Sequence, residues 1–199
     1  MKKKKVNPNR IPVKGSSIDA HALTDKITRD VTFRVWLDFM AALASFSQTT
    51  QQTMLDLWEN VNVYSSLLSK YNNVAKVLAD IESLTGITFE FRPVTTSKHN
   101  TKNELQKLES QLQRNAVAAG FALIGGPIIY GKYYDEETTA RLFAKAFSYD
   151  EDIASGKLKP EDIQMMLRDE YDISLEKTET GSSLDTGPAP KAAFLAKVP

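Results

Sequence analysis

Residues 126–133 (GPIIYGKY) come closest to a chemical motif, because they nearly fit the phosphate-binding loop Gly-x4-Gly-Lys-Ser/Thr. That loop needs a preceding strand, backbone N–H groups that face phosphate, and a hydroxyl that binds magnesium. Here Pro127 removes one N–H group, Tyr133 stands where Ser or Thr is required, and a helical pattern precedes the glycines. We therefore interpret the glycines as a turn that ends a helix.

A second pattern is the twelve-residue run 150–161 (DEDIASGKLKPE), which has acids at its first, third and twelfth positions, as a calcium loop does. Its glycine, however, falls at the seventh position rather than the sixth, and Ala154 occupies a ligand position. An acidic helix end followed by a turn at Gly156 explains the run better. We expect no metal site.

Catalysis by a nucleophile has little support in the residue types. The chain has no cysteine and only two histidines, His21 and His99. A hydrolytic triad needs a histidine held by a carboxylate. His21 lies near Asp19 and Asp25 and is interpreted as a surface residue, whereas His99 has no acid near it in the sequence. We predict a protein that is not an enzyme, with no catalytic residue and no cofactor.

Charge is balanced overall but unevenly placed. The chain has 199 residues with 25 basic and 25 acidic side chains, so its net charge predicts no strong polyanion binder. Six basic residues and no acid stand in residues 1–14, namely Lys2, Lys3, Lys4, Lys5, Arg10 and Lys14. This basic arm could bind a nucleic-acid backbone by neutralising phosphates, or it could simply be a solvated arm.

Residues 150–179 have the opposite bias, with ten acids and four bases. Acidic surfaces can bind basic partners by presenting carboxylates where phosphates would lie. The residues expected to form such a partner-binding surface are Asp150, Glu151, Asp152, Glu161, Asp162, Asp169 and Glu170.

The first long helix is expected to begin near residue 16 and to run to about Phe46. Apolar residues recur every four positions from 23 to 35, and after that the helix is apolar on most sides. A narrow polar stripe remains at Arg34, Asp38 and Ser45, with Arg34 and Asp38 close enough to pair. A helix that is apolar on most sides is typically the central helix of a bundle.

Further helices are predicted by spacing and by capping residues. The second starts after Thr49 or Thr50 and runs to about residue 71, and the third covers about 72–84 and ends at Gly86. A capping box at 101–104 opens the fourth, which halts at 125–127; Asp135 opens the fifth and Pro160 the last. Alternating residues predict one short extended segment at 87–92.

Residues 116–130 contain fifteen consecutive uncharged residues, which raises the alternative of a membrane-inserting hairpin. A membrane span needs about 20 apolar residues, and Pro127 interrupts this run, so a buried helix is favoured. The sequence leaves open whether other helices of this chain or a second copy of the chain bury the helix at 116–130. In the second case the protein would be a homo-oligomer.

The predicted fold class is mainly α, a helical bundle around a long, mostly buried first helix. We expect a basic flexible arm at 1–15, a single helical domain at 16–177, which could form two lobes (16–92 and 101–177), and a disordered tail at 178–199. Asn7, Pro8 and Asn9 follow the first lysines where a secretory signal would be apolar, so a cytoplasmic location is expected.

Three parts of the sequence resemble small accessory proteins of temperate phages and prophages of Gram-positive bacteria. They are the run KKKKVNPNRIPV at 2–13, the helix with Trp36, and the stretch Leu57-Trp58-x-x-Val61-Asn62. The stretch from Pro160 to Ile173 has a similar character. The resemblance covers mainly residues 1–65. It implies a mobile-element origin and a location in the host cell cytoplasm. It also implies an accessory role. Such accessory proteins commonly act by binding and occupying a host protein, and the host proteins that are bound include components of host defence.

Three functions follow from these observations. The favoured one is a non-enzymatic accessory protein that binds a host or phage protein through the acidic surface. The first alternative is a nucleic-acid-associated protein that uses the basic arm. The second is a small-molecule-binding helical protein with a pocket among Trp36, Phe39, Trp58 and Tyr64, although a plain core is the favoured interpretation of these aromatic residues.

Overall fold

The computed structural model describes residues 20–71, 74–92, 102–178 and 182–186. These residues form six helices and one two-stranded antiparallel hairpin. The elements are α1 (Ala20–Ala44), α2 (Gln51–Tyr71), α3 (Val74–Thr85), α4 (Lys102–Gly131), α5 (Glu136–Ala154), α6 (Pro160–Tyr171), β1 (Ile173–Lys177) and β2 (Ser182–Thr186). The mainly α fold class is confirmed.

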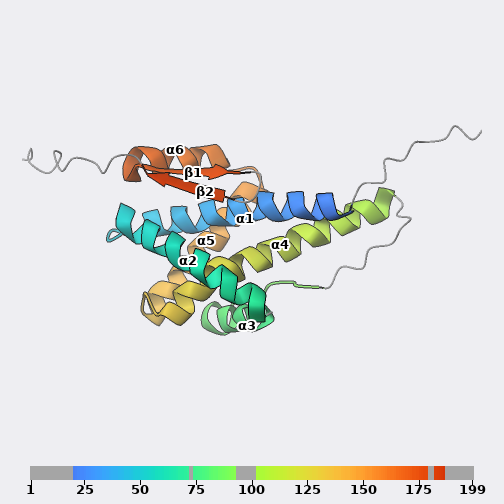
Figure 1. Ribbon diagram of the computed structural model, residues 1–199, viewed down its shortest axis with the longest axis horizontal. Coiled ribbons are helices and arrows are strands. Elements are labelled where there is room, and N and C mark those ends of the chain that lie inside the picture. The colour runs from blue at the N-terminus through green and yellow to red at the C-terminus, as the bar shows by residue number, and fades with distance from the viewer. Residues whose placement is uncertain (1–19, 72–73, 93–101, 179–181, 187–199) are drawn as a thin grey trace, which may run out of the picture.

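Helix α1 lies at the centre of the bundle, with α4 along one side and α6 and the hairpin along another (Figure 1). Helix α5 also packs along α1, and α2 and α3 pack on α4. Every residue from Val35 to Leu43 is buried, including Phe39, whose ring contacts Phe121 of α4 and Phe143 of α5 at centroid distances of 5.2 and 5.3 Å. The predicted central role of the first helix is therefore confirmed, and both halves of the chain share one core.

The ends of several helices follow the predicted caps. The Thr50 hydroxyl accepts a hydrogen bond from the Thr53 N–H group at the start of α2, and the Asp135 carboxylate accepts one from the Thr138 N–H group at the start of α5. Pro160 is the first residue of α6, where no N–H donor is needed. Gly86, with φ of 72°, ends α3.

Helix α4 does not halt at residues 125–127, so that prediction is wrong. The helix continues through Gly125, Gly126 and Pro127 to Gly131. A Cβ atom at Gly125 would lie 2.5 Å from the Phe143 ring, and one at Gly126 would lie 2.5 Å from the Tyr64 ring. The two glycines therefore allow neighbouring aromatic rings to contact the α4 backbone, and this packing outweighs the low helix propensity of glycine and proline.

The extended parts of the structure differ partly from expectation. Residues 87–92, where a short extended segment was expected, form no strand and belong to no sheet, and Phe89 packs on Phe121 and Phe147. Strand β2 lies within the range expected to be a disordered tail. It pairs with β1 so that Leu184 faces Leu175, which is buried against the core. Residues 187–199, and the basic arm expected at 1–15, lie outside the described residues.

Candidate functional site

The predicted acidic surface is only partly present. Five of its members are exposed, namely Glu151, Glu161, Asp162, Asp169 and Glu170. Asp152 is half-buried and pairs with Lys157 at 3.3 Å. Asp150 points inward instead, and one of its carboxylate oxygens accepts a hydrogen bond of 2.7 Å from the Nε of Arg34. Asp150 is therefore part of the packing between α1 and α5 rather than part of an open surface.

The exposed acids of α6 surround one apolar side chain. Met165 is 57% exposed, and Glu161, Asp162 and Asp169 lie one helical turn before or after it. We call these four residues the α6 acidic face. Two contacts hold α6 in place: the Tyr171 hydroxyl donates to the Ala44 carbonyl at 3.0 Å, and Gln164 donates to the Leu175 carbonyl at 2.7 Å. The face is thus anchored to the end of α1 and to the hairpin.

Arg34, Asp38 and Asp150 form a cluster of ionisable groups inside the bundle. Asp38 is fully buried, contrary to its expected place on a polar stripe, and neither of its carboxyl oxygens has a hydrogen-bond partner of normal geometry among the described residues. Burial, and then the nearby Asp150 carboxylate, raise the pKa of Asp38 to about 9, against the opposing effect of Arg34. Asp38 is therefore a neutral carboxylic acid at neutral pH.

The aromatic residues expected to line a pocket pack together in the structure. The Trp36 and Trp58 rings lie 4.5 Å apart, and Phe39 is completely buried between Phe121 and Phe143. Tyr64 packs beside Tyr130 and against Gly126. This arrangement fits the alternative interpretation of these residues as core.

A cleft lies elsewhere, between the connection from α1 to α2 and the start of α5. Its volume is about 650 Å³, within the range of small-molecule sites. A smaller pocket of about 140 Å³ shares Thr53, Tyr133 and Tyr134 with it and extends it along α2. We call this feature the Arg141 cleft; its main part is lined by Leu43, Ser45, Phe46, Ser47, Gln48, Thr49, Thr53, Tyr133, Tyr134, Asp135, Thr138, Arg141 and Leu142.

Arg141 is the one basic side chain in the lining of this cleft. Its guanidinium group lies over the Phe46 ring, 5.5 Å from the ring centroid, and no acid pairs with it among the residues that the structure describes. Sequence reasoning missed this site because its two halves are about ninety residues apart in the chain.

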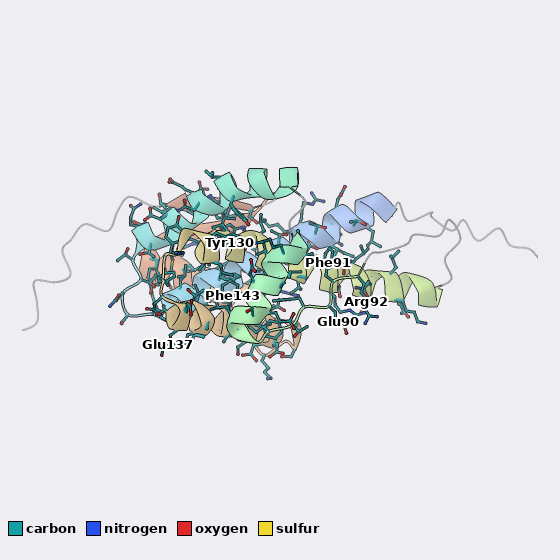
Figure 2. All side chains as sticks on the ribbon, turned by 90° about the horizontal axis from the view of Figure 1, so that it is seen from below. Glu90, Phe91, Arg92, Tyr130, Glu137 and Phe143 are labelled. Carbon is teal, nitrogen blue, oxygen red and sulfur yellow. The ribbon has the colours of Figure 1, made fainter. Side chains whose placement is uncertain are left out.

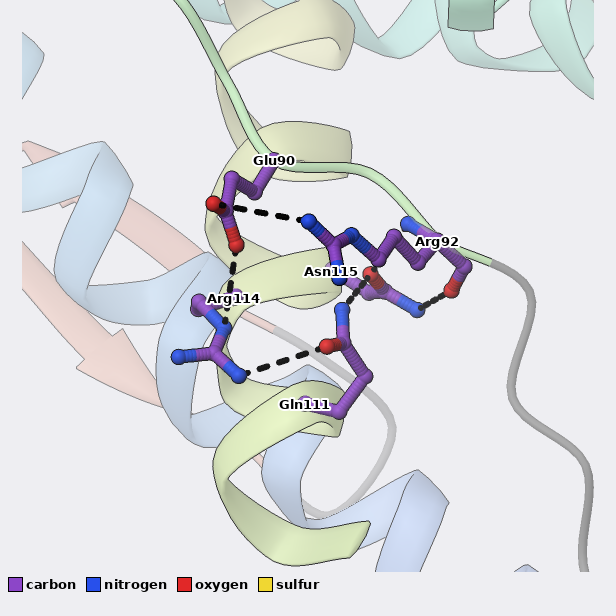
Figure 3. A network of polar contacts seen from close by, with 5 residues as sticks. All are labelled: Glu90, Arg92, Gln111, Arg114 and Asn115. Carbon is purple, nitrogen blue, oxygen red and sulfur yellow. Dashed lines mark hydrogen bonds and ion pairs between the residues drawn. The ribbon is translucent and has the colours of Figure 1, made fainter. Parts of the chain in front are cut away.

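A polar network fixes residues 90–92, which follow α3, to α4 (Figure 3). The Asn115 amide donates to the Arg92 carbonyl at 2.6 Å, and its oxygen accepts from the Arg92 N–H group at 3.1 Å. Glu90 lies 3.8 Å from the Arg92 guanidinium and 3.9 Å from that of Arg114. Asn115 thus supplies the pair of hydrogen bonds that a neighbouring strand would otherwise make.

Figure 2 shows that Glu90, Phe91 and Arg92 lie toward one end of the molecule and Glu137 toward the other. Between them, Tyr130 of α4 contacts α3. Its hydroxyl donates to the Asp80 carboxylate at 2.5 Å, and Lys76 lies within 3.1 Å of the same carboxylate. These hydrogen bonds lower the pKa of Asp80. All three residues join α3 to α4, and we assign them a structural role.

Several predicted residues lie outside what the structure describes. These include the six basic residues of the arm and His99, and nothing is described of the His21 side chain. Within the described ranges, no group of three or more potential metal ligands is present. None of the helices described there is long and apolar enough to cross a membrane.

Comparison with known proteins gives no relationship from which a role could be taken. No family model, no curated protein and no solved structure matches the chain.

Proposed function

We propose that this protein is non-enzymatic and acts by binding another protein, with the α6 acidic face as its contact surface. The observation that carries the proposal is the exposure of Met165 with carboxylates one turn away on both sides. A methionine side chain adapts its shape to a partner, which suits a contact residue. The surrounding carboxylates favour a partner that has basic residues around an apolar pocket.

The charge of this face also indicates what kind of protein the partner is. Proteins that bind nucleic acid carry basic grooves, and a row of carboxylates can occupy such a groove in place of phosphates. The resemblance to phage accessory proteins supports a host protein of this kind, including a component of host defence. In this proposal the chain inhibits its partner by occupying that groove.

The test is affinity capture with the full chain as bait in lysate of a Gram-positive bacterium, followed by mass spectrometry. The variant Asp162→Lys/Asp169→Lys reverses charge on the face, and Met165→Ala removes its apolar centre. A matched control, Glu59→Lys/Glu109→Lys, reverses two exposed acids on α2 and α4. Asp150 is left unchanged, because its substitution would break the contact with Arg34.

We expect one defined partner that is lost from the face variants, retained by the control variant, and weakened when the salt concentration rises from about 0.05 to about 0.5 M. A partner that is captured equally by all variants and at all salt concentrations would reject the α6 acidic face as the contact surface.

A further inference from the structure

We propose that the Arg141 cleft binds a small organic anion, specifically a molecule with one carboxylate on a flat apolar body. This site is separate from the α6 acidic face and does not depend on the function proposed for that face. The proposed small-molecule site therefore differs from the pocket among Trp36, Phe39, Trp58 and Tyr64 that was considered from the sequence.

The cleft has the size and the mixed lining that such a ligand requires. Small-molecule sites are concave, mostly apolar and equipped with a few polar groups that orient the ligand. Here Phe46 provides apolar surface above the buried side chains of Leu43 and Leu142, and Tyr133 and Tyr134 add aromatic rings from the connection between α4 and α5. The smaller adjoining pocket lengthens the cleft toward Ile128.

Three hydroxyl groups of the cleft are already used as donors inside the protein. Ser45 donates to the Ala42 carbonyl and Thr49 donates to the Leu43 carbonyl, both at 2.6 Å. The Thr138 hydroxyl lies 3.1 Å from the Asp135 carboxylate. These three hydroxyls have no further proton to offer to a ligand. The other hydroxyls of the lining, on Ser47, Thr53, Tyr133 and Tyr134, are uncharged, so the attraction for an anion must come from a cationic side chain.

The Arg141 guanidinium is that cation. It lies over the Phe46 ring, and no carboxylate of the described residues forms an ion pair with it. A guanidinium group offers a rigid fork of N–H groups that matches a carboxylate. Because the contact with the Phe46 ring already restricts the guanidinium group, less conformational freedom is lost when it binds a ligand.

The charge balance favours a carboxylate over a phosphate. Asp135 also lines the cleft, and hydrogen bonds from Thr138 lower the pKa of its carboxyl group, so it is negatively charged at neutral pH. A ligand with one negative charge is neutralised by Arg141. A phosphate with close to two charges would face one cation and the repulsion of Asp135.

The experiment is a titration of the isotope-labelled full chain with three probes, followed by nuclear magnetic resonance and calorimetry. The probes are 2-naphthoate, its neutral analogue 2-naphthamide, and 2-naphthyl phosphate. The Arg141→Gln variant removes the charge at similar length. The control Arg168→Gln removes an exposed arginine of α6, outside the cleft. Thermal unfolding checks that both variants remain folded.

We expect 2-naphthoate to bind most tightly and to shift the amide signals of Thr49, Thr138 and Arg141. Loss of a charged hydrogen bond predicts that Arg141→Gln weakens naphthoate binding by about tenfold to a hundredfold, with no effect on naphthamide and none from Arg168→Gln. The proposal is overturned if naphthoate causes no shifts at about 10 mM, a concentration that detects even very weak binding. It is also overturned if naphthamide or the phosphate binds as tightly, or if Arg168→Gln has the same effect.

Discussion

The buried carboxyl group of Asp38 makes a strong prediction about stability. We expect Asp38→Asn to raise the free energy of unfolding at neutral pH, although it alters a residue in the middle of the core. The folded protein holds Asp38 as a neutral acid, whereas the unfolded chain releases its proton at an ordinary pKa of 3.8. Folding at neutral pH must therefore take up a proton, which costs free energy. Asparagine is neutral in both states and avoids that cost.

The sign and size of the effect follow from the two pKa values. Because the pKa of this acid is higher in the folded state, the wild type loses stability as pH rises from about 4, and the loss stops only near pH 9. Each pH unit between these limits costs about 1.4 kcal/mol, so the cost is about 4 kcal/mol at pH 7 and about 1.5 kcal/mol at pH 5. The advantage of the asparagine variant should grow over that range.

The assay is urea unfolding of wild type and variant at pH 5, 6, 7 and 8, followed by the fluorescence of Trp36 and Trp58. The matched control is Asp30→Asn, which alters an exposed acid of the same helix that pairs with Lys177 at 2.9 Å. An exposed pair of this kind contributes up to about 1 kcal/mol, so the control should differ little from wild type at any pH. If the advantage of Asp38→Asn is the same at pH 5 and pH 8, Asp38 is charged in the folded protein and the reasoning from burial is wrong.

Three further variants test the packing. Gly125→Ala should destabilise the fold by about 1–3 kcal/mol in urea unfolding, because its Cβ would overlap the buried Phe143 ring and outweigh the gain in helix propensity; increased stability would show that the ring moves aside. Asn115→Ala should cost about 1–2 kcal/mol and speed hydrogen exchange at the Arg92 amide, whereas unchanged exchange would mean that the amide contact is not formed in solution. Tyr171→Phe should lower stability by about 1 kcal/mol through loss of the hydrogen bond to Ala44, and an unchanged midpoint would show that water replaces this bond.

Local sequence rules predicted the helices well where the pattern of one helix, or one capping residue, was enough to determine the position or the start of the helix. The apolar sides of the first helix identified it as the centre, and Thr50, Asp135 and Pro160 marked true helix starts. The same rules failed at Gly125 and Gly126, because what decides there is the approach of rings from α5 and α2. They also assigned Ser182–Thr186 to a tail, since its polar composition does not show that β1 offers a pairing edge.

The candidate sites depend on contacts between residues that are far apart in the sequence, and the spacing of residues within one helix does not predict such contacts. Arg34 and Asp38 have the spacing of a surface pair, yet Arg34 binds Asp150, which lies 116 positions further along the chain. That contact removes Asp150 from the surface and leaves Asp38 in the interior. The Arg141 cleft likewise joins residues 43–53 to residues 133–142, so neither half signals a site by itself.

The position of α1 at the centre also sets an order of events during synthesis. This helix is made well before α4, α5 and α6, the helices with which it makes most of its contacts, so its apolar sides are not fully covered until the next hundred or so residues have been added. At about 5–20 residues per second, that interval lasts roughly 5–20 s on the ribosome. During this interval the nascent chain presents a surface suited to chaperones, and mature packing waits until α5 brings Asp150 to Arg34.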